Sequence, residues 1–278
     1  MKNIAFLSCR DLSGFVTDDE LLAHELENYG CRVSTLNWDS DAQWSKYDMV
    51  IIRTTWDYTK RPEEFLSTLA AIQTQTKLLN PMNVVKWNIH KGYLKELSSA
   101  GVNIVPTQFF TWPSERPRIE SHWNAKKFIL KPCISAGSLN TMVVTDEELN
   151  QGSYSSKMVP GDWMLQPFLE EILEGEVSLH FFGKKFSHSI IKVPKHGDFR
   201  VQEEFGGNIL PHTPDNELME FAIKTIESAP GEAFYARVDG VKHNGKWLLM
   251  ELEMVEPSLY FRTNKMAAPN FREALMKI

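Results

Sequence analysis

The first 80 residues alternate short apolar stretches with amphipathic stretches, and this alternation constrains the fold more than any other feature of the chain. Residues 3–7, 32–36 and 49–52 have the composition of buried strands, and the intervening segments place apolar residues on one helical face. Strands that alternate with helices form a parallel sheet, whose ligands bind beyond the carboxyl ends of the strands. We therefore predict an α/β protein with α+β subdomains that begins with a small Rossmann-like unit, residues 1–80.

Polar and aromatic residues follow the third predicted strand directly. Arg53 and Tyr58 flank Trp56 and Asp57 in this segment, at the edge of the sheet where ligands bind. Two interpretations stay open: a substrate site that includes Arg53 and Tyr58, or an ordinary polar loop with a packing tryptophan. No GxGxxG motif follows the first strand, so a bound dinucleotide is not indicated.

Length and composition favour a folded protein of two or three subdomains. The chain has 278 residues, of which 42% are hydrophobic, and a formal charge of −6. This acidity argues against nucleic acid as the main partner. No apolar run reaches the roughly 18 residues that a membrane span needs, and the first strand begins too early for a signal peptide. We expect a cytoplasmic protein with a small-molecule substrate, no membrane or nucleic-acid partner and three chemically idle cysteines, with a homodimer as an open alternative.

The middle of the chain contains lysines that could contact phosphate. Asn88 is predicted to cap a helix that runs to Gly101, which would place Lys91 in its first turn. A cation there opposes the helix dipole, so Lys91 is either solvated or close to an anion such as phosphate. A predicted strand over residues 127–132 contains Lys131 and leads into a loop of small residues. These are Ser135, Ala136, Gly137 and Ser138. The N–H groups of such a loop could cover phosphate oxygens, although the Walker A spacing is absent.

A proline-containing strand over residues 164–169 resembles a hinge between two lobes. Exposed backbone groups at a hinge can bind the edge of an adenine, and a carboxylate further along the chain can accept hydrogen bonds from a ribose. Downstream, Lys192, Lys195 and Arg200 form a basic stretch. This stretch is either a charged loop or a source of positive charge for a transferring phosphoryl group.

The segments 236–239 and 250–253 carry the strongest local chemistry. Both are predicted strands, joined near an Asn244-Gly245 turn. Glu251 and Glu253 alternate with apolar residues and therefore share one face of their strand, where their mutual repulsion favours a bound cation. A hard, oxygen-seeking ion such as Mg²⁺ fits these carboxylates.

The length of the turn decides whether Asp239 joins the two glutamates. A two-residue loop would pair Asp239 with Met250 and direct it to the opposite face. We therefore predict a three-residue loop over 243–245 that ends in a bulge, so that Arg237 faces Glu251. The shared face would then carry Arg237, Asp239, Glu251 and Glu253. It would hold three metal ligands beside a cation able to stabilise an oxyanion, whereas the alternative is a surface hairpin with ordinary charges.

Together these residues resemble the ATP-grasp superfamily, which includes glutathione synthetase and D-alanine–D-alanine ligase. The resemblance covers about residues 80–260. Its motifs are Lys91, Lys131, the loop 135–138, residues 166–169, Glu176, Arg237-x-Asp239 and Glu251-x-Glu253. Residues 53–58, 197–202 and 256–261 are more similar to the branch that contains the ATP-grasp cyclo-ligase of cycloserine biosynthesis. The resemblance implies a central lobe over 81–165 and a C-terminal lobe over 166–278 that clamp ATP, after an N-terminal substrate subdomain.

The resemblance also implies a role for each residue. ATP phosphates would contact Lys91 and Lys131, adenine would contact Gln166, Phe168 and Leu169, and ribose would contact Glu176. One or two Mg²⁺ ions would bind Asp239, Glu251 and Glu253, although many members carry asparagine at the position of Glu253. Arg200 and Arg237 would neutralise the γ-phosphate and the tetrahedral intermediate. Arg53, Tyr58, Arg200 and Gln202 are the predicted substrate contacts.

The reaction implied by the resemblance is the ATP-dependent activation of a carboxylate as an acyl phosphate, which an amine-type nucleophile then captures. The loop 135–138 is the predicted lid, because water would hydrolyse the mixed anhydride. Three classes of function stay open: an intermolecular carboxylate–amine ligase, an intramolecular cyclo-ligase and a non-catalytic nucleotide-binding module.

Overall fold

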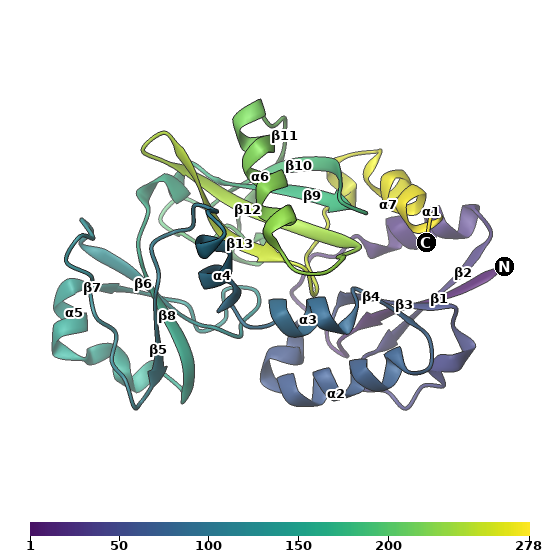
Figure 1. Ribbon diagram of the computed structural model, residues 1–278, viewed down its shortest axis with the longest axis horizontal. Coiled ribbons are helices and arrows are strands. Elements are labelled where there is room, and N and C mark those ends of the chain that lie inside the picture. The colour runs from purple at the N-terminus through teal and green to yellow at the C-terminus, as the bar shows by residue number, and fades with distance from the viewer.

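The first sheet of the protein is small and parallel. The computed structural model describes residues 1–278 and contains three sheets that follow one another along the chain (Figure 1). The strands of the first are β1 (Lys2–Ser8), β2 (Cys31–Asn37), β3 (Met49–Thr54) and β4 (Lys77–Leu79), in the order β2-β1-β3-β4. Helices α1 (Asp19–Asn28) and α2 (Pro62–Gln73) connect them. All its strand pairs are parallel, which confirms the predicted α/β beginning of the chain.

The second sheet is antiparallel and follows two short helices, α3 (Met82–Asn88) and α4 (Tyr93–Ser99). Its strands are β5 (Gln108–Trp112), β6 (Lys127–Pro132), β7 (Met142–Thr145) and β8 (Gly161–Pro167), in the order β5-β8-β6-β7. Helix α5 (Asp146–Gln151) begins at Thr145, whose side chain forms a capping box with Glu148. This sheet has its own core, which includes Phe128 and Trp163.

The third sheet is also antiparallel and packs against helix α6 (Asn216–Ser228). Its strands are β9 (Glu176–Phe182), β10 (Lys185–Val193), β11 (Asn208–His212), β12 (Tyr235–His243) and β13 (Lys246–Glu253), in the order β11-β10-β9-β12-β13. The Asp215 side chain caps α6 by accepting the N–H of Leu218 at 2.8 Å. Helices α4 and α6 contribute to the core of this sheet, so the segment before the second sheet stabilises the third.

The end of the chain returns to its beginning. Helix α7 (Ala267–Leu275) packs beside α1, and Phe271 lies in a core shared by the first and third sheets (Figure 1). No helix is both long and apolar enough to cross a membrane. The predicted subdomain limits, near residues 80 and 165, stay predictions.

Asn80 joins the first sheet to the third. Its amide, which is 0% exposed, donates to the carbonyl oxygens of Tyr235 and Met254 at 2.8 and 2.6 Å. Its side-chain oxygen accepts the backbone N–H groups of Phe234 and Tyr235. Because a buried amide with all these bonds formed fixes the groups it contacts, Asn80 sets how the hairpin β12–β13 lies on the N-terminal unit.

The predicted helix from Asn88 to Gly101 is wrong. The structure has two helices, and Asn88 ends the first of them instead of capping the second. Its amide donates to Leu252 O at 2.8 Å and accepts the N–H of Met254 at 2.7 Å, so it binds the edge of β13. Lys91 therefore lies in the connection between α3 and α4, and a helix dipole does not explain its position.

Candidate active site

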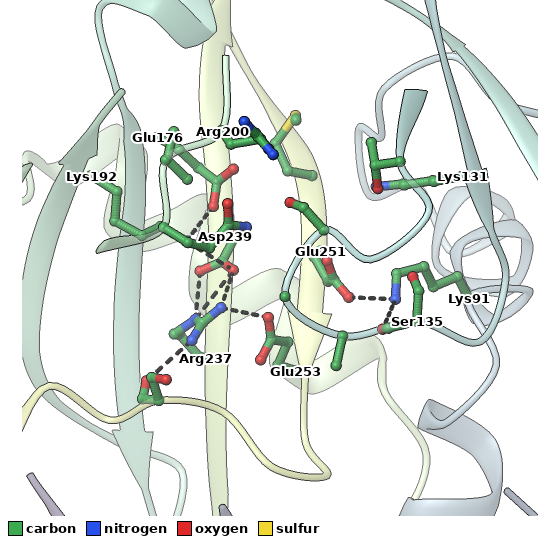
Figure 2. A pocket seen from close by; sticks show the side chains of 18 of the residues that line it. Lys91, Lys131, Ser135, Glu176, Lys192, Arg200, Arg237, Asp239, Glu251 and Glu253 are labelled. Atoms are coloured by element: carbon green, nitrogen blue, oxygen red, sulfur yellow. Dashed lines mark hydrogen bonds and ion pairs between the residues drawn. The ribbon is translucent and has the colours of Figure 1, made fainter. Parts of the chain in front are cut away.

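A large cavity is lined by residues of the second and third sheets and by connections of the first sheet. The strands and the connections between them bring to it nearly every residue that the sequence predicted. These are Tyr58, Lys91, Lys131, Ser135, Ala136, Gly137, Ser138, Gln166, Phe168, Leu169, Glu176, Arg200, Gln202, Arg237, Asp239, Glu251 and Glu253. Figure 2 shows the acids on the third sheet and Lys91 and Lys131 across from them.

Arg53 does not line this cavity, which corrects its prediction as a substrate contact. Its side chain is 2% exposed and donates to the Asp19 carboxylate at 2.7 Å and to the Pro257 carbonyl at 3.4 Å. With its donors directed at the protein, Arg53 holds the segment 255–258 in place.

The hairpin β12–β13 places the predicted acids on one face, but its loop length and strand register differ from the predicted ones. Its loop has two residues, Asn244 and Gly245, both with positive φ (50° and 76°). The register shifts by one residue between Asp239 and Gly240, so Met250 is the extra residue of a bulge. The predicted three-residue loop is therefore wrong.

Beyond the bulge, Asp239 pairs with Glu251 and Arg237 pairs with Glu253, not with Glu251. A Cβ at Gly240 would lie 3.3 Å from the Phe221 ring, which favours glycine at this position.

Arg237 and Lys192 hold Asp239 as an anion. The guanidinium of Arg237 donates to both Asp239 oxygens, at 2.9 and 2.8 Å, and also contacts Glu253. Ser178 Oγ donates to Asp239 at 2.6 Å, and Lys192 Nζ lies 3.4 Å from it while contacting Glu176 (Figure 2). Burial acts to raise the pKa of Asp239, but the charges of Arg237 and Lys192 outweigh burial and lower it.

The sequence predicted Lys192 only as part of a basic stretch, which is either a charged loop or a source of positive charge, and not as a residue of the site by itself. It lies on β10 opposite Glu176 and is 3% exposed. Counting register outward from the two-residue Gly183-Lys184 turn would have paired Glu176 with Ile191, because a bulge between Phe186 and His188 shifts the register by one residue. Burial acts to lower the pKa of Lys192, and the charges of Asp239 and Glu176 reverse this and raise it.

A second cationic group lies across from the hairpin. Lys91 Nζ lies 2.8 Å from Glu251 and donates to the Ser135 carbonyl at 2.8 Å, which ties the loop 135–138 to β13. Lys131 also lines the cavity but has no ion-pair partner within 4.0 Å, and burial lowers its pKa. A half-buried cation without a counter-ion is suited to an anionic ligand.

The predicted metal ligands are not assembled around a common point. No group of three or more His, Cys, Asp or Glu side chains is placed to hold a metal ion. Each acid is paired with a cation instead: Asp239 and Glu253 with Arg237, and Glu251 with Lys91. Their chemistry nonetheless fits a hard cation, because carboxylates on one sheet face repel each other. Burial, together with the nearby Glu251 and Asp239, raises the pKa of Glu253 to about 7, an excess of negative charge that a cation would relieve.

Two predicted residues have partners that restrain them. Arg200 binds Asp198 through two of its nitrogens, at 3.0 and 2.7 Å, and its guanidinium stacks 3.7 Å from the Phe205 ring centre. Gln166 is 3% exposed and donates to Thr107 Oγ1 at 2.9 Å. By contrast, Gln202 lines the cavity with a buried Oε1 that has no hydrogen-bond partner.

Lysines line one side of the cavity and acids of an antiparallel hairpin line the other. The chain has the ATP-grasp fold, as its motifs predicted. Comparison with solved structures confirms this assignment. D-cycloserine synthetase DcsG superimposes with a TM-score of 0.84 at 22% identity, over 99% of both chains. D-alanine–D-alanine ligase of Bacillus anthracis, solved with ATP, superimposes with a TM-score of 0.70 at 13% identity, over 100% of this chain and 97% of the ligase.

Proteins of cycloserine biosynthesis are among the relatives that the chain resembles. Residues 4–80 match the family described as D-cycloserine synthetase DcsG, N-terminal domain. The cycloserine biosynthesis protein DcsG of Streptomyces lavendulae is 26% identical over an alignment of 277 positions that covers 88% of this chain and 88% of the relative. The ATP-grasp ligase PsnB, solved with a minimal precursor, has a TM-score of 0.67 at 14% identity over 100% of this chain and 99% of PsnB.

Proposed function

We propose that the protein is an ADP-forming ligase that activates the carboxylate of a small amino-acid-like substrate as an acyl phosphate for capture by an amine-type nucleophile. One observation carries this proposal. The unpaired Lys131 and the Lys91–Glu251 pair lie in the same cavity as the acids Asp239 and Glu253. This arrangement suits a polyphosphate with a divalent cation on one side and lysines on the other.

The nucleotide would occupy this cavity between the second and third sheets. Lys91 and Lys131 would contact its phosphates, and the loop 135–138 would cover them as a lid. Gln166, Phe168 and Leu169 would surround the adenine. Glu176 would accept hydrogen bonds from the ribose hydroxyls. The direct bond from Lys91 to the Ser135 carbonyl supports the lid, because a phosphate bound to Lys91 would also reposition that loop.

One or two Mg²⁺ ions would bind Asp239, Glu251 and Glu253. Such an ion would neutralise negative charge on the nucleotide phosphates. To receive it, Glu251 would exchange Lys91 for the ion and Glu253 would exchange Arg237. Both cations would then be released toward the phosphates, so nucleotide binding and site assembly would be coupled.

The residues of this chain would act mainly by positioning and by charge. The substrate carboxylate would attack the γ-phosphorus in line, with Arg200 and Arg237 stabilising the negative charge on the transferring group and then on the tetrahedral intermediate. The nucleophile would displace phosphate from the acyl carbon. For Arg200 to take part, its guanidinium would leave Asp198, which now holds it.

An intramolecular version of the reaction is the second candidate. Its support is the likeness to the cycloserine protein DcsG over 88% of both chains. In such a cyclo-ligase the nucleophile belongs to the same molecule as the activated carboxylate. We further propose a cytoplasmic location; a homodimer remains an alternative to a monomer.

Release of ADP and inorganic phosphate tests the proposal. We would supply Mg²⁺, ATP and a panel of small amino acids and O-substituted serines of both configurations, singly and in pairs. A ligase forms ADP in stoichiometric amounts with a condensed or cyclised product seen by mass spectrometry. Dependence on one compound indicates cyclisation, and strict dependence on two indicates ligation. Asp239→Asn should abolish turnover; full activity of this variant would refute the assigned site.

A further inference from the structure

Glu256 is a buried carboxylate without an ion-pair partner. Four acids are at most 8% exposed, and Asp18, Glu176 and Asp239 each contact an arginine or lysine. Glu256 is 7% exposed and lines the cavity, yet no lysine, arginine or histidine nitrogen lies within 4.0 Å of it. An unpaired buried carboxylate is costly, so its position calls for a missing partner.

The backbone that presents Glu256 is fixed at three successive carbonyl oxygens. Tyr235 donates its hydroxyl to Val255 O at 2.8 Å, and Trp56 donates its indole N–H to Glu256 O at 3.0 Å. Arg53 contacts the next carbonyl, Pro257 O. Such support holds a side chain in one direction and is more than a surface loop needs.

Aromatic rings line the same cavity around this segment. Trp56, Tyr58 and Tyr260 belong to the lining, and the Phe15 ring lies 4.8 Å from the Trp56 ring. Aromatic faces attract cations, and a carboxylate among them is suited to an ammonium group.

The pocket of Glu256 adjoins the proposed site of phosphoryl transfer. Arg237 donates to Ser258 O at 3.1 Å, two residues beyond Glu256 on the same cavity wall. A small molecule with its ammonium group on Glu256 could therefore present its carboxylate toward Arg237. Both charges of an amino acid would then have partners of opposite sign.

We propose that Glu256 binds the ammonium group of the substrate and so selects amino acids with a free amine. This inference rests on the proposed ligase function and adds the substrate class and the residue that recognises it. Glu256 acts as a specificity residue: it contacts the substrate but takes no part in bond making.

Matched compounds test the inference. We would measure ADP release by the wild type with D- and L-serine, their O-substituted derivatives and the N-acetylated counterpart of each. ADP release should require the free amine. Glu256→Gln should raise KM for the productive amino acid roughly 10- to 100-fold, as expected for the loss of one charge-assisted hydrogen bond, while KM for ATP changes less than about threefold. Glu217→Gln is the control, because Glu217 is exposed and pairs only with Lys242.

Stability separates recognition from a structural role. Glu256→Gln should not lower Tm, because no ion pair is broken, whereas a structural carboxylate would lower it. Equal turnover of N-acetylated compounds, or an unchanged KM in Glu256→Gln, would overturn the inference and leave the ligase proposal intact. A wild type that binds ATP but forms no ADP with any compound would overturn the ligase proposal and this inference together.

Discussion

Replacing Glu256 with glutamine should stabilise the protein without ligand, and increasingly so as the pH rises. The pKa of Glu256 is raised from an ordinary 4.5 to about 8, mainly by burial and further by the charges of Glu253 and Glu251, with Lys91 and Tyr58 acting in the opposite direction. Between these two pH values the folded protein holds a proton that the unfolded chain has lost. Stability therefore falls as the pH rises from about 4.5 to 8, and then stays level.

The structure gives the size of this effect. The change from 4.5 to about 8 corresponds to on the order of 5 kcal/mol for an ionised Glu256. Because the cavity admits water, which offsets part of this cost, we expect Glu256→Gln to gain about 2 kcal/mol at pH 8.5. For a chain of this length that gain raises Tm by about 4 °C.

Differential scanning fluorimetry of the wild type and Glu256→Gln from pH 4.5 to 9 measures the effect. The difference in Tm should be near zero at the acid end and grow to its full value by about pH 8.5, where Glu217→Gln shows no comparable gain. A difference that is constant with pH, or a Glu256→Gln protein that is less stable at pH 8.5, would refute the reasoning.

Three further substitutions test other parts of the structure. Lys131→Met should weaken binding of an ATP analogue roughly 10- to 100-fold in calorimetry. It should not lower Tm, since Lys131 has no ion pair to lose. Lys126→Met is the control, and unchanged affinity of the Lys131→Met variant would remove Lys131 from the phosphate site. Asn80→Leu should reduce the free energy of unfolding in urea by about 4 kcal/mol, because four buried backbone groups lose their partner; a loss below about 1 kcal/mol would contradict that role. Lys192→Met should reduce the free energy of unfolding by about 3 kcal/mol, because Glu176 and Asp239 lose a buried cation. The variant should also stop releasing ADP, and normal turnover would show that Lys192 is dispensable.

The sequence predicted the larger features because they depend on local patterns. Alternating strands and helices indicate a parallel sheet wherever they occur, and the structure contains one. The acids of the hairpin were correctly placed on one face, because side chains two apart on a strand must share it. The residues that line the cavity follow from the same ordered motifs.

Contacts between distant segments decided the features that the sequence did not reveal. The bulge at Met250 depends on how β12 and β13 pack against α6, including the Phe221 ring beside Gly240. Asn88 resembled a helix cap, but its amide meets backbone groups of β13 more than 160 residues later. Arg53 had the type and position of a substrate contact, and only the fold shows that Asp19 and Pro257 occupy it.

Magnesium-dependent binding of a non-hydrolysable ATP analogue tests the central claim most directly. Isothermal titration calorimetry of the wild type should show affinity that Mg²⁺ increases by at least about tenfold, as expected when the ion joins the nucleotide to Asp239, Glu251 and Glu253. In the double variant Glu251→Gln/Glu253→Gln, Mg²⁺ should change the affinity less than about twofold. Equal enhancement in both proteins, or no binding by the wild type, would contradict the account.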